Sequence, residues 1–243
     1  MNGEVVGKFK KLRDKILKEE YDLVILVVGD EGEGKSTLAL QLAQIFDKNF
    51  NVNHVYFEKS DIRRFLRNIE KDRKGRVHIF DEGEKFFEKL ETNSTMYKVF
   101  NSYLKSHRAL QQFYIVCSPD FELSSRFLRR VDIVIVIPKR GLAYLYTKNM
   151  KTKLLFKYEE IKKRFGFVDL NFLVQNVPPA YIFSFDKVDE KLFNEYEKEK
   201  EKRLRESSKY YEKLLEKRGV IVEDDVKEDD SNESPFDVLT FRA

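Results

Sequence analysis

The residues best suited to chemistry lie in one stretch that reads GDEGEGKST. Its glycines allow the backbone to curl until successive N–H groups point into one concavity, which suits a polyphosphate. The Lys35 ammonium can reach the outer phosphates, and the Ser36 hydroxyl can be a ligand of Mg²⁺. The spacing G-x-x-x-x-G-K-[ST] therefore predicts a phosphate-binding loop. Its candidate binding residues are Gly29, Asp30, Glu31, Gly32, Glu33, Gly34, Lys35, Ser36 and Thr37.

The segments on either side of this loop predict how it is held. Leu23 to Val28 is an apolar run without alternation, which is typical of a strand buried on both faces. Apolar residues at helical spacing follow the loop, at Leu38, Leu42 and Ile45. A helix starting near Lys35 directs its positive dipole end toward the phosphates.

Two carboxylates follow a second buried strand. Val77–Phe80 is apolar apart from one histidine, and Asp81 and Glu82 come directly after it. An aspartate at the end of a strand beside a phosphate loop can hold Mg²⁺. A glutamate next to it can polarise the attacking water as a general base. In isolation such a pair is more often a helix N-cap; after a buried strand we interpret it as catalytic.

Further candidate site residues are a serine and four arginines. Ser118 ends a predicted strand over 113–117, where it could contact the terminal phosphate or serve as a simple turn residue. Arg108 ends a predicted helix over 94–110, and Arg126, Arg129 and Arg130 lie in a short helix over 122–130. Any one of these arginines could act as an arginine finger in the site of a neighbouring subunit.

The order of the elements predicts an α/β fold with a mostly parallel sheet sandwiched by helices. A β-hairpin extension is expected near 139–147, and a strand near 180–185. The predicted organisation is an N-terminal helix over 1–20, the α/β domain over 21–188, a long charged helix over 189–219 and an acidic disordered tail over 220–243.

Charge is unevenly distributed along the chain. Its 243 residues have a net charge of +4, but the last 23 residues hold eight acidic and two basic residues, which leaves +10 on the remainder. A basic body permits a DNA partner, although solvated surface lysines are as common a cause. The only cysteine, Cys117, excludes an intramolecular disulfide. Without a long apolar run, we expect a cytoplasmic protein with no membrane partner, in the host cytoplasm if it is viral.

Lys35, Ser36, Asp81 and Glu82 together resemble the P-loop ATPases of the RecA/AAA type, which carry an additional catalytic glutamate. The resemblance covers about residues 21–150. It implies ATP and Mg²⁺ as ligands, and one strand inserted between the phosphate-loop strand and the Mg²⁺ strand. The guanine-binding pattern Asn-Lys-x-Asp is absent from the sequence, which favours ATP over GTP.

Within that class, the sequence is most similar to the FtsK–HerA group of DNA-pumping ATPases, which includes small ATPases of archaeal viruses and plasmids. The similarity lies in Asp81-Glu82 followed by Phe86-Phe87, and in the helix end at Lys105-Ser106-His107-Arg108. It implies a ring-forming motor for DNA translocation, packaging or transfer, and the expected homo-oligomer is a hexamer. The group commonly has glutamine where this chain has Ser118.

A second resemblance points to AAA+ ATPases. The run from Ser118 through Arg130, followed by a strand ending at Pro138, resembles their sensor and arginine-finger region. It implies an ATP-driven switch in replication or regulation that works through protein partners. The apolar end of the tail at 235–241 resembles a docking peptide for such a partner, although a frayed terminus is the commoner cause of such a pattern. The predicted strands near 142–147 and 180–185 do not match the helical lid of that family, so this interpretation ranks second.

Overall fold

The computed structural model describes residues 1–87, 102 and 110–217. Met1–Arg203 forms one compact unit, and a second unit begins at Leu204, of which the helical residues through Lys217 are described. The predicted helix ending at Arg108 and the acidic tail lie outside the described residues. The proposed domain boundaries stay predictions.

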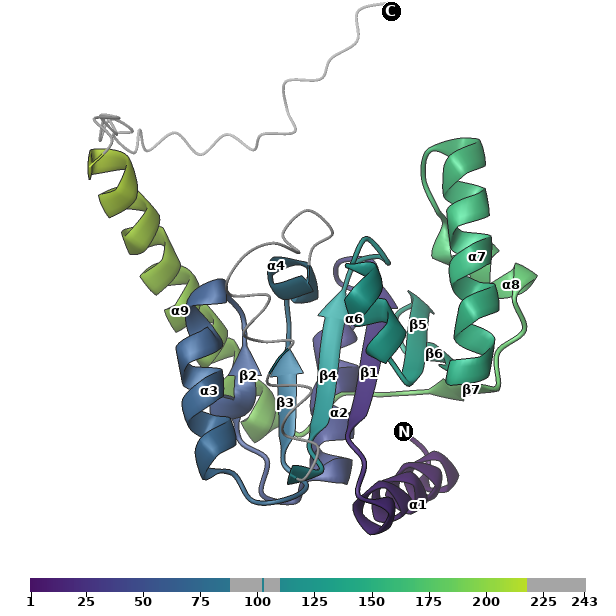
Figure 1. Ribbon diagram of the computed structural model, residues 1–243, viewed down its shortest axis with the longest axis horizontal. Helices are drawn as coiled ribbons and strands as arrows, with labels where there is room; N and C mark the ends of the chain where they lie inside the picture. The colour runs from purple at the N-terminus through teal and green to yellow at the C-terminus, as the bar shows by residue number, and fades with distance from the viewer. Residues whose placement is uncertain (88–101, 103–109, 218–243) are drawn as a thin grey trace, which may run out of the picture. The chain divides into compact units, whose positions relative to one another are not determined.

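One sheet organises the first unit. Its seven strands, among the described residues, run in the order β2-β3-β4-β1-β5-β6-β7 (Figure 1). The first five strands in this order are parallel, β6 pairs antiparallel with β5, and β7 pairs antiparallel with β6. This confirms the predicted α/β class, the mostly parallel sheet and the returning hairpin strand. The strands are β1 (Leu23–Gly29), β2 (Val55–Tyr56), β3 (Val77–Phe80), β4 (Phe113–Ser118), β5 (Ile133–Lys139), β6 (Leu142–Thr147) and β7 (Tyr181–Ser184).

The order of the strands matters for the site. β4 lies between β1, which leads into the glycine loop, and β3, which leads into the two carboxylates. The sequence resemblance implied one inserted strand at this position, and the structure has it. Because the three strands are parallel, their carboxyl ends meet at one edge of the sheet.

Helices cover both faces of the sheet, as expected for a parallel sheet. One face packs against α3 (Ile62–Lys71), α4 (Gly83–Phe87), α6 (Ser125–Arg130), α7 (Lys148–Phe165) and α8 (Leu170–Asn176). The other packs against α1 (Gly3–Glu19), α2 (Lys35–Phe46) and the first turns of α9 (Glu190–Lys217). Alternate residues of β1 enter the two cores, which explains its unbroken apolar run: Leu26 faces one core and Ile25 the other.

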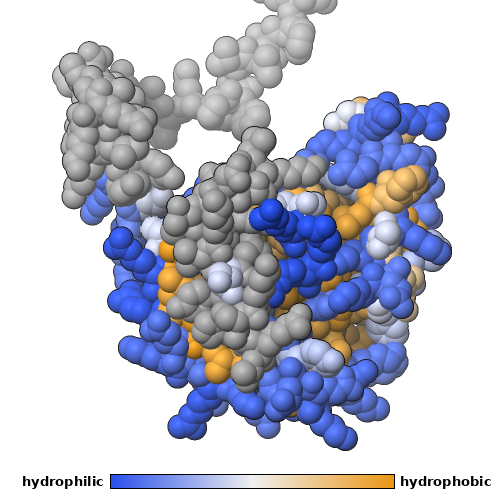
Figure 2. All heavy atoms as spheres, in the orientation of Figure 1, coloured by the Kyte–Doolittle hydropathy of each residue, from blue (hydrophilic) through white to orange (hydrophobic). Residues whose placement is uncertain are grey.

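The surface is mostly hydrophilic on the face drawn in Figure 2, and hydrophobic atoms interrupt it over α7 at the upper right. Phe156 and Phe167, in α7 and just after it, are 72% and 70% exposed. Across the described residues, every helix is too short or too polar to cross a membrane.

Candidate active site

The glycine loop connects β1 to α2 in a compact turn. Gly32 and Gly34 have φ values of 79° and 92°, which only glycine adopts readily. A Cβ added to Gly34 would lie 3.2 Å from the ring of Phe185, so the ring would have to shift by a few tenths of an ångström. The Lys35 ammonium donates hydrogen bonds to the carbonyls of Gly29, at 2.7 Å, and Asp30, at 3.0 Å. The lysine is thus folded back over the loop.

Asp81 lies where β3 ends and contacts the loop directly. The Ser36 hydroxyl donates a hydrogen bond to Asp81 Oδ1 at 2.6 Å. The Tyr196 hydroxyl, from α9, donates to Asp81 Oδ2 at 2.6 Å. Burial raises the pKa of Tyr196 well above its ordinary value, and the carboxylate beside it adds to the shift. The tyrosine therefore stays protonated and donates.

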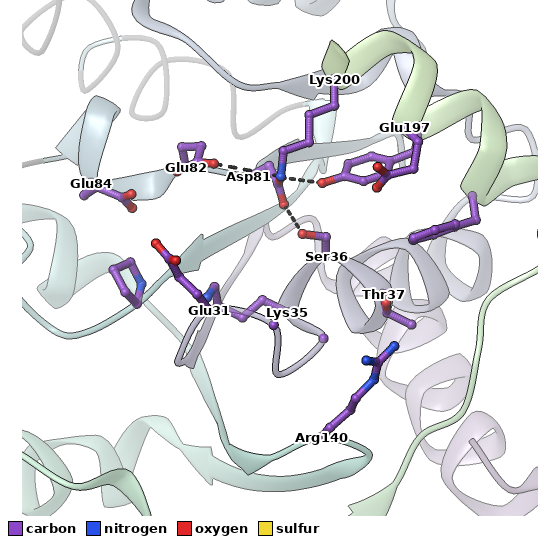
Figure 3. A pocket seen from close by; sticks show the side chains of 15 residues that line it. Glu31, Lys35, Ser36, Thr37, Asp81, Glu82, Glu84, Arg140, Glu197 and Lys200 are labelled. Carbon is purple, nitrogen blue, oxygen red and sulfur yellow. Dashed lines mark hydrogen bonds and ion pairs between the residues drawn. The ribbon is translucent and has the colours of Figure 1, made fainter. Parts of the chain in front are cut away.

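A second ammonium group, that of Lys200, lies close to the carboxylates of Asp81 and Glu82. Lys200 Nζ, also from α9, is 3.5 Å from Asp81 Oδ2 and 4.0 Å from Glu82 Oε1. Figure 3 shows its side chain reaching from the α9 ribbon toward Asp81 and Glu82. Arg140, from the β5–β6 hairpin, lies on the opposite side of the loop, near Thr37 (Figure 3). Cationic groups therefore flank the loop on both sides.

These groups surround one cavity of about 510 Å³. A cavity of this size is in the range that binds small ligands. Its walls come from the glycine loop, the end of β3, the β5–β6 hairpin and α9. The lining residues are Glu31, Gly32, Gly34, Lys35, Ser36, Thr37, Asp81, Glu82, Glu84, Pro119, Arg140, Phe193, Tyr196, Glu197 and Lys200.

Glu82 has an acidic neighbour in the same cavity. The pKa of Glu84 is raised to about 7, chiefly by burial and also by a hydrogen bond and charge repulsion from Glu82, against an opposing backbone hydrogen bond. Glu84 therefore carries a proton part of the time near neutral pH, while the Glu82 carboxylate is about a third exposed. Two carboxyl groups are thus available beside Asp81.

The donor set fits Mg²⁺ bound together with a nucleotide. In the part of the chain that the structure describes, no cluster of three or more His, Cys, Asp or Glu side chains could hold a metal ion. Mg²⁺ in nucleotide sites needs fewer protein ligands, because phosphate oxygens and water supply the rest. Ser36 and Asp81 offer a hydroxyl and a carboxylate oxygen that already touch each other at the cavity wall.

Eight of the sixteen predicted site residues line the cavity, namely Glu31, Gly32, Gly34, Lys35, Ser36, Thr37, Asp81 and Glu82. Ser118 is fully buried at the end of β4 and is not among the lining residues, and its hydroxyl has no hydrogen-bond partner among the described residues. Arg126 and Arg129 are exposed on α6, Arg130 is half-buried, and none of the three lines the cavity of its own chain. Arg108 lies outside the described residues. Asp30 and Glu31 are both exposed, and Glu31 also lines the cavity whereas Asp30 does not.

Sequence reasoning missed the residues that come from distant elements. Arg140 lies in the expected hairpin and belongs to no motif, but it follows β5, the strand next to β1, and this order places it near the loop. Tyr196 and Lys200 were placed in a charged helix and gave no local signal, since 115 positions separate Tyr196 from Asp81.

No protein-family model matches the sequence, and no curated protein matches it significantly. Among solved structures, the chain is similar to the genome packaging NTPase of Sulfolobus turreted icosahedral virus 2 in complex with ATP-gammaS, at 14% identity, over 54% of this chain and 94% of that chain, with a TM-score of 0.41. It is also similar to the N-terminal domain of zonular occludens toxin from Neisseria meningitidis, at 12% identity, over 72% and 98%, with a TM-score of 0.42.

A third similar structure is RuvB of Thermotoga maritima, at 20% identity, over 67% of this chain and 50% of that chain, with a TM-score of 0.38. Similarities at this level show no activity. The function therefore has to be argued from the site itself.

Proposed function

We propose that this chain is a Mg²⁺-dependent ATPase. The observation that carries the proposal is the hydrogen bond from Ser36 to Asp81, which joins the glycine loop to the end of β3 at the wall of the cavity. This pair supplies the hydroxyl and carboxylate that nucleoside triphosphate sites use for the metal. The strand order β3-β4-β1 supports the same class of enzyme.

The residues divide the work as follows. The loop amides and Lys35 bind the phosphates, and Lys35 exchanges its present bonds to loop carbonyls for phosphate oxygens. Ser36 and Asp81 would hold Mg²⁺, which supplies charge neutralisation of the β- and γ-phosphates. Glu82 accepts the proton of the attacking water.

We propose further that hydrolysis is coupled to work on DNA. Support comes from the resemblance to DNA-pumping ATPases and from the charge of +10 on the chain before its acidic end. Phosphate contacts from lysine and arginine dominate the affinity of proteins for DNA, so a basic body is a requirement for such a function.

The motor would be a ring in which each site is completed by a neighbour. Arg126 and Arg129 are exposed and lie away from their own cavity, which is where a finger for another subunit has to be. Loss of such a finger lowers the rate by roughly 10³–10⁵-fold in related chemistry. A double variant Arg126→Ala/Arg129→Ala should therefore be inactive alone but regain activity when mixed with Lys35→Ala, which has intact arginines. A mixture of Lys35→Ala with Ser36→Ala should stay inactive. Full activity of the double variant alone would leave the finger role to Arg130 or Arg108.

The deciding experiment measures ATP hydrolysis with and without double-stranded DNA at physiological salt, with Lys35→Ala as the control for contaminating activity. The motor predicts Mg²⁺-dependent hydrolysis that DNA stimulates strongly. Hydrolysis that DNA leaves unchanged, together with weak DNA binding, would favour the AAA+-like switch that acts through protein partners. No hydrolysis above the Lys35→Ala control would contradict the ATPase proposal as a whole.

A further inference from the structure

The proposed metal ligand Asp81 has a hydrogen-bond partner from the C-terminal part of the compact unit. Tyr196 of α9 donates a hydrogen bond to Asp81 Oδ2, while Ser36 donates to Oδ1, and both bonds are 2.6 Å long. The carboxylate is thus held at both oxygens. Asp81 is 6% exposed and Tyr196 is 2% exposed, so solvent competes little for either bond.

Tyr196 is fixed in place by its surroundings. Its ring centroid lies 5.6 Å from that of Phe57, after β2, and 6.0 Å from that of Phe193. Leu192, one turn earlier on α9, is buried in the same core. The hydroxyl therefore has little freedom to leave the carboxylate unless the helix moves.

The start of α9 is anchored on both sides of this tyrosine. Before the helix, the Gln41 amide donates hydrogen bonds to the carbonyls of Asp186, at 2.6 Å, and Lys187, at 3.0 Å. After Tyr196, Glu199 forms an ion pair with Arg64 of α3 at 3.4 Å. These contacts hold the first turns of α9 in place beside the site.

The Lys200 side chain is held less firmly than that of Tyr196. Its ammonium lies 3.5 Å from the same Asp81 oxygen, but its side chain is 31% exposed. A long side chain with an exposed end can swing away when a metal ion and phosphates arrive. The buried hydroxyl cannot, and it is the group that sets the orientation of the carboxylate.

We infer that Tyr196 is a positioning residue for the Mg²⁺ site, holding Asp81 Oδ2 so that Oδ1 and the Ser36 hydroxyl face the metal together. This inference rests on the proposed nucleotide and Mg²⁺ binding. Hydrogen bonds to a metal-binding carboxylate orient it, and their loss typically weakens metal affinity or activity by 10–100-fold.

The test is Tyr196→Phe, which removes one oxygen and keeps the buried ring. Binding of a fluorescent ATP analogue is titrated with Mg²⁺, so that the readout does not depend on turnover. We expect the Mg²⁺ concentration at half-maximal effect to rise roughly 10–100-fold, while binding of the analogue without Mg²⁺ stays unchanged.

The matched control is Tyr146→Phe. The Tyr146 hydroxyl is also buried and donates a hydrogen bond to the Val177 carbonyl at 2.9 Å, away from the cavity. Both variants lose one buried hydrogen bond, so thermal melting should show similar losses of stability. Only Tyr196→Phe should change the Mg²⁺ dependence.

A double-mutant cycle with Asp81→Asn isolates the pair. If Tyr196 acts through Asp81, adding Tyr196→Phe to Asp81→Asn should not change the Mg²⁺ dependence further. An unchanged or lowered Mg²⁺ requirement in Tyr196→Phe would overturn the positioning role, and so would an equal further loss in the Asp81→Asn background. A wild-type protein that binds the analogue with no effect of Mg²⁺ would instead contradict the proposed function.

Discussion

Ser36 and Asp81 are joined by a 2.6 Å hydrogen bond, although they are 45 positions apart in the sequence. The sheet explains the contact. β1 and β3 run parallel with β4 between them, so the loop after β1 and the acidic pair after β3 emerge at the same edge. α2 then begins at Lys35 and directs the Ser36 hydroxyl to the carboxylate.

The two glutamates in the cavity can be separated by substitution. Glu82→Gln removes the proposed base and should lower kcat by about 10²–10⁴-fold with little change in ATP affinity. Glu84→Gln should have a clearly smaller effect, because Glu84 already carries a proton part of the time near pH 7. Single-turnover hydrolysis and nucleotide binding by both variants test this. The reverse order of effects would give the role of base to Glu84.

Gly34 should be intolerant of even one methyl group. Gly34→Ala combines an unfavourable φ of 92° with a Cβ that would lie 3.2 Å from Phe185, so we expect loss of nucleotide binding. Gly166→Ala is the control: its φ is 83°, but nothing lies within 4 Å of the added Cβ. The control should lose about 1–2 kcal/mol of stability from backbone strain and keep its nucleotide affinity. Equal nucleotide affinity of the two variants would show that the loop does not need glycine at position 34 to bind nucleotide.

Arg140 should contribute to nucleotide affinity within its own chain. It lines the cavity from the β5–β6 hairpin, whereas its neighbour Lys139 is exposed and does not. Arg140→Ala should raise the Kd for ATP by about tenfold, which corresponds to ~1.4 kcal/mol, and Lys139→Ala should leave it unchanged. Titration at two salt concentrations gives the electrostatic part of the effect. Equal effects of both substitutions would indicate only a general charge contribution.

His78 should make stability depend on pH. It is fully buried in β3, and its Nδ1 lies 3.0 Å from the Tyr56 hydroxyl. Burial lowers its pKa to about 3, so the folded protein keeps the ring neutral. The unfolded chain takes up a proton near pH 6.5, and the free energy of unfolding should therefore fall as the pH decreases below that value, by at most ~1.4 kcal/mol per pH unit.

Urea denaturation of wild type and His78→Phe at about pH 7.5 and about pH 5 checks this dependence, because phenylalanine does not titrate. The variant should lose less stability between the two pH values than the wild type does. An identical loss would show that other groups account for the acid sensitivity.

Local patterns were enough to predict the core of this fold. The unbroken apolar run of β1 and the glycine spacing predicted a buried strand, a loop and a helix, and the structure has all three. The acidic pair was placed correctly at the end of β3, because strand and carboxylates are adjacent in sequence. The hairpin around Gly141 was predicted from its turn residues.

Long-range contributions could not be predicted in this way. The helical pattern of α9 shows sparse apolar residues, and nothing in the pattern indicates which carboxylate Tyr196 meets. Its partner depends on where the chain leads after β7, which is set by contacts such as those of Gln41 with the backbone at 186 and 187. The side of α6 that carries Arg126 and Arg129 likewise follows from packing rather than from composition.

The path of α9 also limits how far the protein can be shortened. The charged segments near the C-terminus invite removal in biochemical work, and the predicted domain boundary at 188 suggests a place to cut. A cut there would delete Tyr196 and Lys200, remove the wall of the cavity that α9 forms and leave Asp81 Oδ2 with fewer partners. A shortened version that keeps the compact unit through Arg203 retains every described residue of the cavity.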